Sequence, residues 1–596
     1  MDTDEFVHAI SSIPSFGSPA ASPSGERLAF VSDETGQSVV YVQEVATGDR
    51  HPAIKDPELA HGGGPLLWLD DDELLFHLGE GGLANRTVAV HRVDGDTETL
   101  FSRDQVCLVI AVSPGSKRVL FRSGEGPDDL FEYHFEAAET TRLTETPGRI
   151  AEAHYGPGGD RIAYRHSDEG RGKSIHILDR DSGETTPLEI GTESSYTDVE
   201  AWNTERNLLL VEDDDHGKRR CGVYDPETDE TTWLTDDSEI DAAAAFTPDG
   251  ERVLANRTTE CRLLPVQYDT DTGAVGSFDL PDGFGKVRKL AHTGFISDRE
   301  LLVTHQTPRQ PERLLRYDLV DDEFEPVYDP TPESLERDTF VECAYERIES
   351  FDGLELETLL FDAGTRPSPL VVKIHGGPVT QDYRTFDPFT QLFTAAGYSV
   401  LKVNYRGSKG RGTQFRRRMI ANPNKAQRDV AAVTETVRDR PWVDADRVAA
   451  VGDSFGGYSV LMQLALHGEQ YTAGVAMSPQ TNLETLIEQT MSLDRDIMEK
   501  FTGDWEQSTF WEYSPVSHAE EITAPLCLIH GTEDERVPIS QTREFAEELE
   551  AVGREREPAG TLRVEELVGL SHGLGDPETR KRVYGEYLDF LGEYLG

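Results

Sequence analysis

Hydrophobic and polar positions repeat along the first half of the chain with a period of roughly 45 residues. Short stretches that alternate apolar and polar residues, as half-buried strands do, are separated by turns rich in Asp, Thr and Gly such as Asp181–Glu184. Four units open alike, at Ser22–Leu28, Ser113–Val119, Gly156–Ile162 and Thr247–Val253. Three weaker copies begin near Trp68, Trp202 and Ile296. A unit this small cannot bury its own apolar face, so the seven units predict a β-propeller whose blades stack around a ring.

The second half carries strand patterns of a different kind. Arg447–Val451 is a short, apolar, β-branched run, as a buried parallel strand should be, and it is followed by the helix-forming run Tyr458–His467. Similar strand patterns occur at Pro369–Ile374, Ala524–Ile529 and Thr561–Gly569, and a terminal helix is expected to begin near Pro577. This arrangement predicts an α/β domain.

The turn between the first of these strands and its helix is Gly452–Gly457, with Ser454 between glycines. Glycines allow a sharp turn, which lifts the serine hydroxyl above the sheet edge in the geometry called a nucleophile elbow. A Gly-x-Ser-x-Gly pattern alone is weak evidence, because roughly 0.3 chance matches are expected in a chain this long. Its position between a strand and a helix makes Ser454 a candidate nucleophile.

An acid and a base follow in suitable loops. The strand pattern ending at Ile529 runs into the acidic loop His530–Pro538, which contains Asp534. The later strand pattern ends ahead of His572, on a loop from which an imidazole can reach the nucleophile. The chain order Ser, Asp, His is the one that α/β-hydrolases use.

An oxyanion hole needs two N–H donors aimed at the developing negative charge. The strand pattern ending at Ile374 opens into His375-Gly376-Gly377-Pro378, where glycines leave backbone N–H groups unshielded. One of these glycines could act together with the N–H of Phe455.

Each assignment has a competitor. Glu533 and Glu535 compete with Asp534, His530 and His375 compete with His572, and Gly376 competes with Gly377. Arg406 either binds a substrate carboxylate or forms an internal ion pair, and the second is favoured. Four aromatic residues either line a specificity pocket or pack in the core, and core packing is favoured. They are Trp505, Phe510, Trp511 and Tyr513.

Five segments resemble the prolyl oligopeptidase family of serine peptidases, and its acylaminoacyl-peptidase branch more than the others. They are His375–Pro378, Asn404–Ser408, Gly452–Tyr458, His530–Pro538 and Ser571–Gly573. The resemblance implies that Ser454 is the nucleophile, Asp534 the acid, His572 the base, and Gly377 with Phe455 the oxyanion donors. It also implies a two-domain chain, with an N-terminal seven-bladed β-propeller followed by a C-terminal α/β-hydrolase domain. We expect residues 1–20 to be helical and packed on the hydrolase domain, 21–335 to form the propeller, and 336–596 to form the catalytic domain.

The balance of charge is strongly acidic: 111 Asp and Glu against 57 Lys and Arg give a net charge of −54. Such an excess repels itself in dilute buffer unless salt shortens the Debye length, and the acidic residues are spread through both halves. The composition therefore predicts halophilic adaptation. Nucleic acid is not expected as a partner, because no basic face is available to neutralise phosphates.

Export and membrane signals are absent from the sequence as given. The segment Met1–Phe6 has no basic region before an apolar core, and no run of 18 apolar residues occurs. The 5 cysteines are widely spaced and odd in number. We therefore expect a cytoplasmic protein with free thiols, no metal and no cofactor; a homo-oligomer is compatible with the sequence.

The expected function is a serine peptidase that hydrolyses short peptides through an acyl-enzyme, releasing acylated N-terminal amino acids, with the propeller as a size filter. A histidine base predicts that activity falls on the acid side of neutrality. Two alternatives stay open: a carboxylesterase on the same scaffold, and a propeller binding protein without catalysis. Dipeptidyl-peptidase activity is less favoured, because no acidic pair for holding a free amino terminus is recognisable in the blades.

Overall fold

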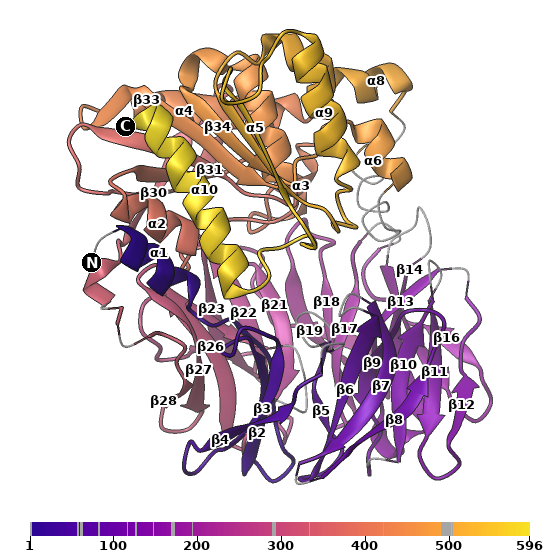
Figure 1. The fold of residues 1–596 in the computed structure, drawn as a ribbon. Coiled ribbons are helices and arrows are strands. Elements are labelled where there is room, and N and C mark those ends of the chain that lie inside the picture. The colour runs from indigo at the N-terminus through magenta and orange to yellow at the C-terminus, as the bar shows by residue number, and fades with distance from the viewer. Residues whose placement is uncertain are drawn as a thin grey trace. The chain divides into compact units, whose positions relative to one another are not determined.

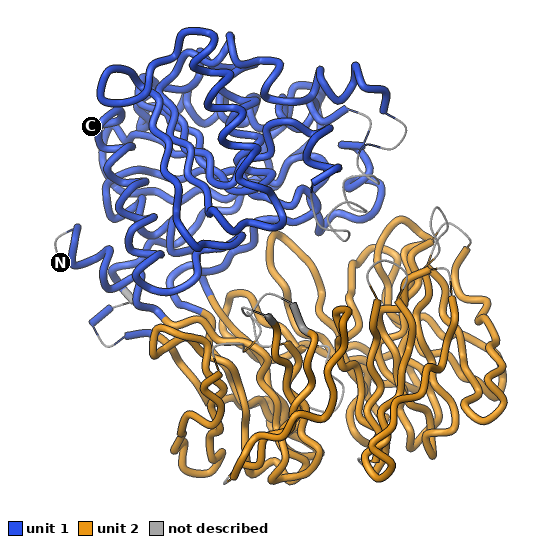
Figure 2. The backbone as a smooth tube through the Cα atoms, turned by 45° about the vertical axis from the view of Figure 1, so that its right-hand side comes forward, with its two compact units in different colours: residues 1–13, 307–311, 331–596 blue, residues 14–306, 312–330 orange. Residues whose placement is uncertain are grey.

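The computed structural model describes most of the chain (Figure 1). The described residues are 3–596 without 57–58, 60–63, 81–83, 94, 116, 125–127, 147, 168–172, 193–194, 289–293, 333, 336, 421, 490–501 and 503–504. The chain divides into two compact units, coloured separately in Figure 2: residues 1–13, 307–311 and 331–596, and residues 14–306 and 312–330.

Within the described residues, the second unit contains seven four-stranded antiparallel sheets, each built from one continuous chain segment. Blade 1 consists of β1 (Phe16–Ala21), β2 (Arg27–Ser32), β3 (Val39–Glu44) and β4 (Arg50–Ile54). Blade 2 consists of β5 (Leu67–Trp68), β6 (Glu73–Glu80), β7 (Ala84–Arg92) and β8 (Thr97–Ser102). Blade 3 consists of β9 (Cys107–Val112), β10 (Arg118–Ser123), β11 (Asp129–His134) and β12 (Glu139–Arg142). Blades 4 and 5 are β13 (Arg149–Tyr155), β14 (Arg161–Ser167), β15 (Lys173–Asp179) and β16 (Thr185–Pro187), then β17 (Asp198–Asn203), β18 (Leu208–Asp213), β19 (Arg220–Asp225) and β20 (Glu230–Trp233). Blades 6 and 7 are β21 (Asp241–Phe246), β22 (Arg252–Thr259), β23 (Arg262–Asp269) and β24 (Val275–Ser277), then β25 (Phe284–Val287), β26 (Glu300–Thr307), β27 (Gln310–Asp318) and β28 (Glu323–Tyr328).

The four repeated openings read from the sequence form the turn between the first and second strands of a blade. In each, the N–H of the first residue donates to a carbonyl five residues later, as from Ser22 to Arg27 at 2.9 Å and from Thr247 to Arg252 at 2.9 Å. The repeat therefore marks a turn that follows each first strand, and the first strand of blade 1 already begins at Phe16. The domain bounds drawn at residues 20 and 335 stay a prediction.

Apolar clusters between neighbouring blades hold the ring together. Blades 1 and 2 share one such cluster, and the same holds for each following pair up to blades 6 and 7. A further cluster joins blade 7 to blade 1, where the rings of Phe30 and Tyr328 lie 4.8 Å apart. The seven-bladed propeller expected from the repeats is confirmed, and side-chain packing closes its ring.

The first unit is built on an eight-stranded sheet. In spatial order its strands are β29 (Cys343–Glu349), β30 (Glu355–Phe361), β32 (Ser399–Asn404), β31 (Ser368–Ile374), β33 (Val443–Asp453), β34 (Ala473–Met477), β35 (Leu526–Gly531) and β36 (Leu562–Leu567). The pairs from β32 onward are parallel, and β29, β30 and β32 pair antiparallel. Each strand pattern predicted in the second half overlaps one of the parallel strands, and the α/β-hydrolase fold is confirmed.

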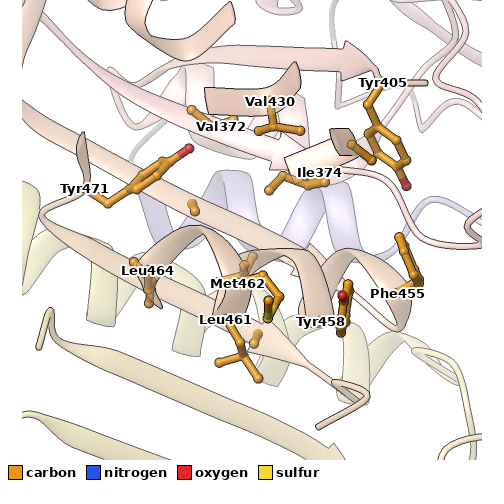
Figure 3. Packing of buried hydrophobic residues seen from close by; sticks show 14 of the residues in the cluster. Val372, Ile374, Tyr405, Val430, Phe455, Tyr458, Leu461, Met462, Leu464 and Tyr471 are labelled. Atoms are coloured by element: carbon orange, nitrogen blue, oxygen red, sulfur yellow. The ribbon is translucent and has the colours of Figure 1, made fainter. Parts of the chain in front are cut away.

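Helices cover this sheet. They are α1 (Thr3–Ser11), α2 (Pro388–Ala395), α3 (Thr413–Arg417), α4 (Asn424–Arg438), α5 (Phe455–Leu466), α6 (Leu483–Gln489), α8 (Gln507–Glu512), α9 (Ser540–Ala551) and α10 (Pro577–Leu595), with short 3₁₀ turns at Arg337–Thr339, Gly468–Gln470 and Pro515–Glu521. One more 3₁₀ turn, Pro157–Gly159, lies in blade 4 of the other unit. Figure 3 shows Leu461, Met462 and Leu464 of α5 in the main core cluster, which also contains Val372 of β31 and Val430 of α4. Helix α5 is therefore anchored on the sheet along its length, which fixes the residue at its start.

Helix α1 packs within the same unit. Its buried residues Phe6 and Ile10 share a cluster with Leu392 of α2 and Tyr584 of α10. The amino-terminal helix expected from the sequence is thus present at Thr3–Ser11, against two helices of the hydrolase unit.

Candidate active site

Ser454 lies in a strained turn between β33 and α5. Its φ of 56° and ψ of −121° belong to a region that residues with a side chain rarely adopt. Its N–H donates to the Met477 carbonyl at 2.9 Å and its carbonyl accepts from Tyr458 at 3.0 Å, so the turn is fixed on both sides. This is the geometry of a nucleophile elbow.

The glycines around Ser454 are required for space. A Cβ on Gly456 would overlap the Ile374 carbonyl oxygen of the neighbouring strand, and one on Gly452 would lie 2.6 Å from the Gly456 backbone. A Cβ on Gly457 would lie 2.9 Å from the Met477 oxygen. The helix therefore approaches the two neighbouring strands as closely as the backbone permits, and the serine is placed by that contact.

The predicted oxyanion donors lie on either side of this turn. Phe455 is the first residue of α5, where helix N–H groups point out of the helix and favour negative charge. Gly376 follows β31, and a Cβ placed on it would come 3.6 Å from Ser454 Cβ. Gly377 has a φ of +123°, which favours glycine. The candidate loop and the elbow are thus neighbours.

Asp534 is the acid that the fold pairs with a histidine. Its Oδ2 accepts a hydrogen bond from His572 Nδ1 at 2.6 Å, while Oδ1 accepts from the backbone N–H groups of Arg536 at 3.0 Å and Val537 at 2.9 Å. Its side chain is fully buried. A carboxylate only accepts, so Nδ1 of His572 carries the proton and Nε2 is the nitrogen left to act as a base.

The loops that carry this pair are joined by backbone bonds. Thr532 N–H donates to Leu567 O, and Glu533 N–H donates to Leu570 O, each at 3.0 Å. A Cβ on Gly531 would overlap the Leu570 carbonyl, so the two loops cross in direct contact. These backbone hydrogen bonds between the loops thus hold Asp534 and His572 within reach of each other.

Ser454 and His572 both follow parallel strands of one sheet, at its carboxyl edge. The structure brings Asp534 and His572 together directly. Within the part of the chain that it describes, it contains no hydrogen bond between the Ser454 hydroxyl and His572.

Hydrogen bonds lower the pKa of the buried acid. Burial by itself raises the pKa of Asp534, but hydrogen bonds from His530 and His572, and from the Val537 N–H, outweigh it and hold the pKa well below its usual value. Asp534 is therefore a carboxylate at neutral pH, which is the form that stabilises an imidazolium.

The competing residues have other surroundings. Glu533 and Glu535 are exposed. His375 is buried and stacks on Tyr405, with ring centroids 4.3 Å apart, and its Nε2 lies 2.9 Å from the Ser408 hydroxyl. These contacts brace the loop that carries Gly376 and Gly377.

Arg406 forms internal ion pairs, as favoured from the sequence. Its guanidinium bonds Asp429 at 2.7 and 2.8 Å and Asp352 at 2.9 and 3.0 Å. All three nitrogens of its guanidinium are thereby bonded within the protein.

The aromatic cluster divides. Tyr513 belongs to the main core, and Trp505 and Phe510 pack against it, as favoured from the sequence. Trp511 differs, because 56% of it is exposed.

Metal sites and membrane-spanning helices are two further features that the structure can test. Within the described ranges, no three His, Cys, Asp or Glu side chains are grouped so that they could hold a metal ion. No helix among those described is long and apolar enough to cross a bilayer.

Sequence reasoning missed one residue next to the acid loop: His530, treated as a rival of His572, lies 3.5 Å from Asp534 Oδ2. Its spacing four residues before the acid is a signal that could have indicated the contact.

The chain is similar to several known proteins. Residues 384–596 match the profile of the prolyl oligopeptidase family. The chain is 27% identical over 337 residues to the acylamino-acid-releasing enzyme of Homo sapiens, covering 50% of this chain and 43% of that protein. It is 25% identical over 407 residues to dipeptidyl aminopeptidase BIII of Pseudoxanthomonas mexicana, covering 61% of this chain and 58% of that protein. The match therefore spans less than two thirds of either relative.

The fold of this chain matches that of a solved structure along nearly its whole length. A puromycin-hydrolysing peptidase of Mycobacterium tuberculosis superposes with a TM-score of 0.87 at 18% identity, covering 99% of this chain and 96% of that one.

Proposed function

We propose that the chain is a serine peptidase of the prolyl oligopeptidase family, whose profile matches residues 384–596, and that it hydrolyses short peptides through an acyl-enzyme. The observation that supports this most directly is the 2.6 Å hydrogen bond between Asp534 and His572, in loops at the same carboxyl edge of the sheet as the strained Ser454. A paired carboxylate and imidazole near a serine in such a turn is the arrangement that acyl transfer needs.

In the proposed reaction, Ser454 Oγ attacks the acyl carbon of the scissile bond while its proton passes to Nε2 of His572. The C–N bond then breaks, and the leaving amine takes that proton from His572. Water loses a proton to the same nitrogen and adds to the acyl-enzyme, after which the acid product leaves and Ser454 regains its hydrogen. Asp534 stays ionised throughout and holds Nδ1–H.

The N–H groups of Gly377 and Phe455 are proposed to stabilise the oxyanion. Two features support them: Phe455 begins a helix, and the loop of Gly376 and Gly377 lies against the elbow. Each donor of this kind is worth about 10²- to 10³-fold in rate.

A fluorophosphonate probe tests the enzyme directly, because it labels only an activated serine. Labelling of the wild type in molar salt and none of Ser454→Ala is the expected result. An unlabelled wild type would favour the alternative of a propeller binding protein without catalysis.

A substrate panel tests the proposed release of acylated amino-terminal residues. The relatives carry names of both acylamino-acid-releasing and dipeptidyl-peptidase kinds, so N-acetylated and free versions of one peptide are the informative pair. We expect the acetylated peptide to be cleaved faster. Faster cleavage of the free peptide supports a dipeptidyl peptidase, and turnover of simple esters alone supports a carboxylesterase.

The propeller is proposed to act as a size filter. A pentapeptide is then cleaved, whereas intact casein is not. Equal cleavage of both would rule this role out.

Halophilic adaptation and a cytoplasmic location stay predictions from the sequence. The charge of −54 predicts that activity and melting temperature both rise between low salt and about 3 M KCl, as the Debye length falls below about 3 Å. A melting temperature that does not depend on salt contradicts the halophilic interpretation.

A further inference from the structure

His530 lies at the end of β35, directly before the acid loop, and its side chain is fully buried. Both ring nitrogens have defined partners. Nδ1 lies 2.7 Å from the hydroxyl of Thr542 on α9, and Nε2 lies 2.8 Å from the carbonyl oxygen of Val537. The same Nε2 lies 3.5 Å from Oδ2 of Asp534.

These partners fix the tautomer of the ring. A carbonyl oxygen only accepts, so the hydrogen bond to Val537 requires a proton on Nε2 of His530. In the neutral ring Nδ1 is then an acceptor, and the Thr542 hydroxyl donates to it. Thr542 is itself fully buried, so nothing from solvent competes for this bond.

The Nε2–H group thus faces two acceptors of one turn. It donates to Val537 O, and the N–H of Val537 donates in return to Asp534 Oδ1. The positive end of the Nε2–H dipole also faces Oδ2, the oxygen that binds His572. A ring fixed on the sheet therefore anchors both the backbone and the carboxylate of the acid turn.

We propose that His530 is a positioning residue of the acid-base pair: its Nε2–H, bonded to the Val537 carbonyl while Nδ1 accepts from Thr542, holds the Asp534 turn so that Oδ2 faces His572. This inference rests on the proposed function, because it assigns the Asp534–His572 pair to catalysis. His530 itself contacts neither the serine nor the substrate in this scheme.

The supporting electrostatics agree. His530, whose Nε2 lies 3.5 Å from Oδ2, is among the groups that hold the pKa of Asp534 below its usual value, together with His572 and the Val537 N–H.

Two substitutions separate a positioning role from simple filling of space. The amide nitrogen of Gln reaches the place of the histidine Nε2, whereas that of Asn reaches the place of Nδ1. His530→Gln therefore keeps a donor toward Val537 and Asp534, and His530→Asn loses it. The readout is fluorophosphonate labelling of Ser454, with the maximal labelling rate and the half-saturating probe concentration measured separately, since this needs no known substrate.

We expect His530→Asn to lower the maximal labelling rate by roughly 10- to 100-fold, by analogy with the loss seen when the hydrogen-bond partners of metal-bound histidines are removed. The half-saturating concentration should not change, because His530 does not contact the probe. His530→Gln should restore most of the rate. Equal rates in folded Asn and Gln variants, whether both are normal or both reduced, would overturn the proposal.

A second pair of variants keeps the test valid if the His530 variants do not fold. Thr542→Val removes the hydroxyl that contacts Nδ1 of His530 while keeping the shape, and Thr542→Ser keeps the hydroxyl. The Val variant should label several-fold more slowly than the Ser variant, and equal rates would contradict the proposal. If the wild type and Ser454→Ala are both unlabelled, the proposed function fails and this inference fails with it; if only the wild type is labelled, a negative result counts against His530 alone.

Discussion

Two regions of the hydrolase unit place the candidate side chains by different physical means. At the elbow, residues 452–457, close packing against neighbouring strands leaves no room for a Cβ on Gly452 or Gly456. At the acid turn, hydrogen bonds decide the arrangement: Asp534 is bound by two backbone N–H groups and by His572. A steric requirement is visible in the sequence as glycines at fixed spacing, whereas a hydrogen-bonded arrangement depends on partners that a motif does not reveal.

The difference also separates two kinds of damage. Adding atoms to the elbow should destabilise the fold, because dense packing cannot absorb a methyl group. Changing a polar atom of the acid turn should leave the fold in place and alter the chemistry.

Removal of the nucleophile gives the largest expected effect. Ser454→Ala should lower the rate of peptide cleavage by about 10⁵-fold or more, since loss of the attacking oxygen removes the whole acyl-enzyme route. Cleavage of a short chromogenic peptide measures the loss, and circular dichroism confirms the fold. Activity within tenfold of the wild type would mean that another residue attacks.

Asp534→Asn tests the region governed by hydrogen bonds. The amide can present its N–H₂ to His572 and so favour the wrong tautomer, which costs about 10⁴-fold in comparable triads. Glu533→Gln is the matched control, because it makes the same chemical change on an exposed neighbour and should keep full activity. Comparable losses in both variants would remove Asp534 from its role.

Gly456→Ala tests the sterically determined region. The new Cβ meets the Ile374 carbonyl of an adjacent strand, and we expect a loss of about 3 kcal/mol or more in the free energy of unfolding. Gly573→Ala, beside His572, is the control, because its Cβ would have nothing within 4 Å. Urea unfolding in molar salt measures both, and equal stability of the two variants would contradict the contrast drawn here.

The same contrast explains what could be predicted from the sequence. The repeat indicated seven blades, and the apolar runs indicated the parallel strands β31, β33, β35 and β36. Both could be predicted because burial and period are local properties. The repeated openings marked a turn, so the start of the first blade at Phe16 was not visible in them. The sequence assigned the base to His572 but did not predict the contact of His530 with Asp534, because only the fold decides which rings face the acid.

The pH dependence of stability offers a smaller effect. Asp534 has a lower pKa folded than unfolded, so it adds stability that is full above the unfolded pKa of about 3.9 and disappears as pH falls through the folded value. Comparing wild type with Asp534→Asn cancels the contributions of other carboxylates. The difference in melting temperature between them should shift against the wild type as pH falls from 5 toward 3; a difference that is constant over this range would show that Asp534 is not held in its ionised form by the fold.

The smallest effect concerns strain at the elbow itself. Ser454 holds a φ of 56° and a ψ of −121°, a conformation that costs a residue with a Cβ about 1–3 kcal/mol and costs glycine much less. Ser454→Gly and Ser454→Ala are both expected to be inactive, but only the glycine variant is relieved of the strain. Part of that relief is offset by the greater freedom of glycine in the unfolded chain, so we expect the glycine variant to be more stable than the alanine variant by about 1 kcal/mol. If the alanine variant is the more stable one, the elbow is not strained, and its geometry follows from packing alone.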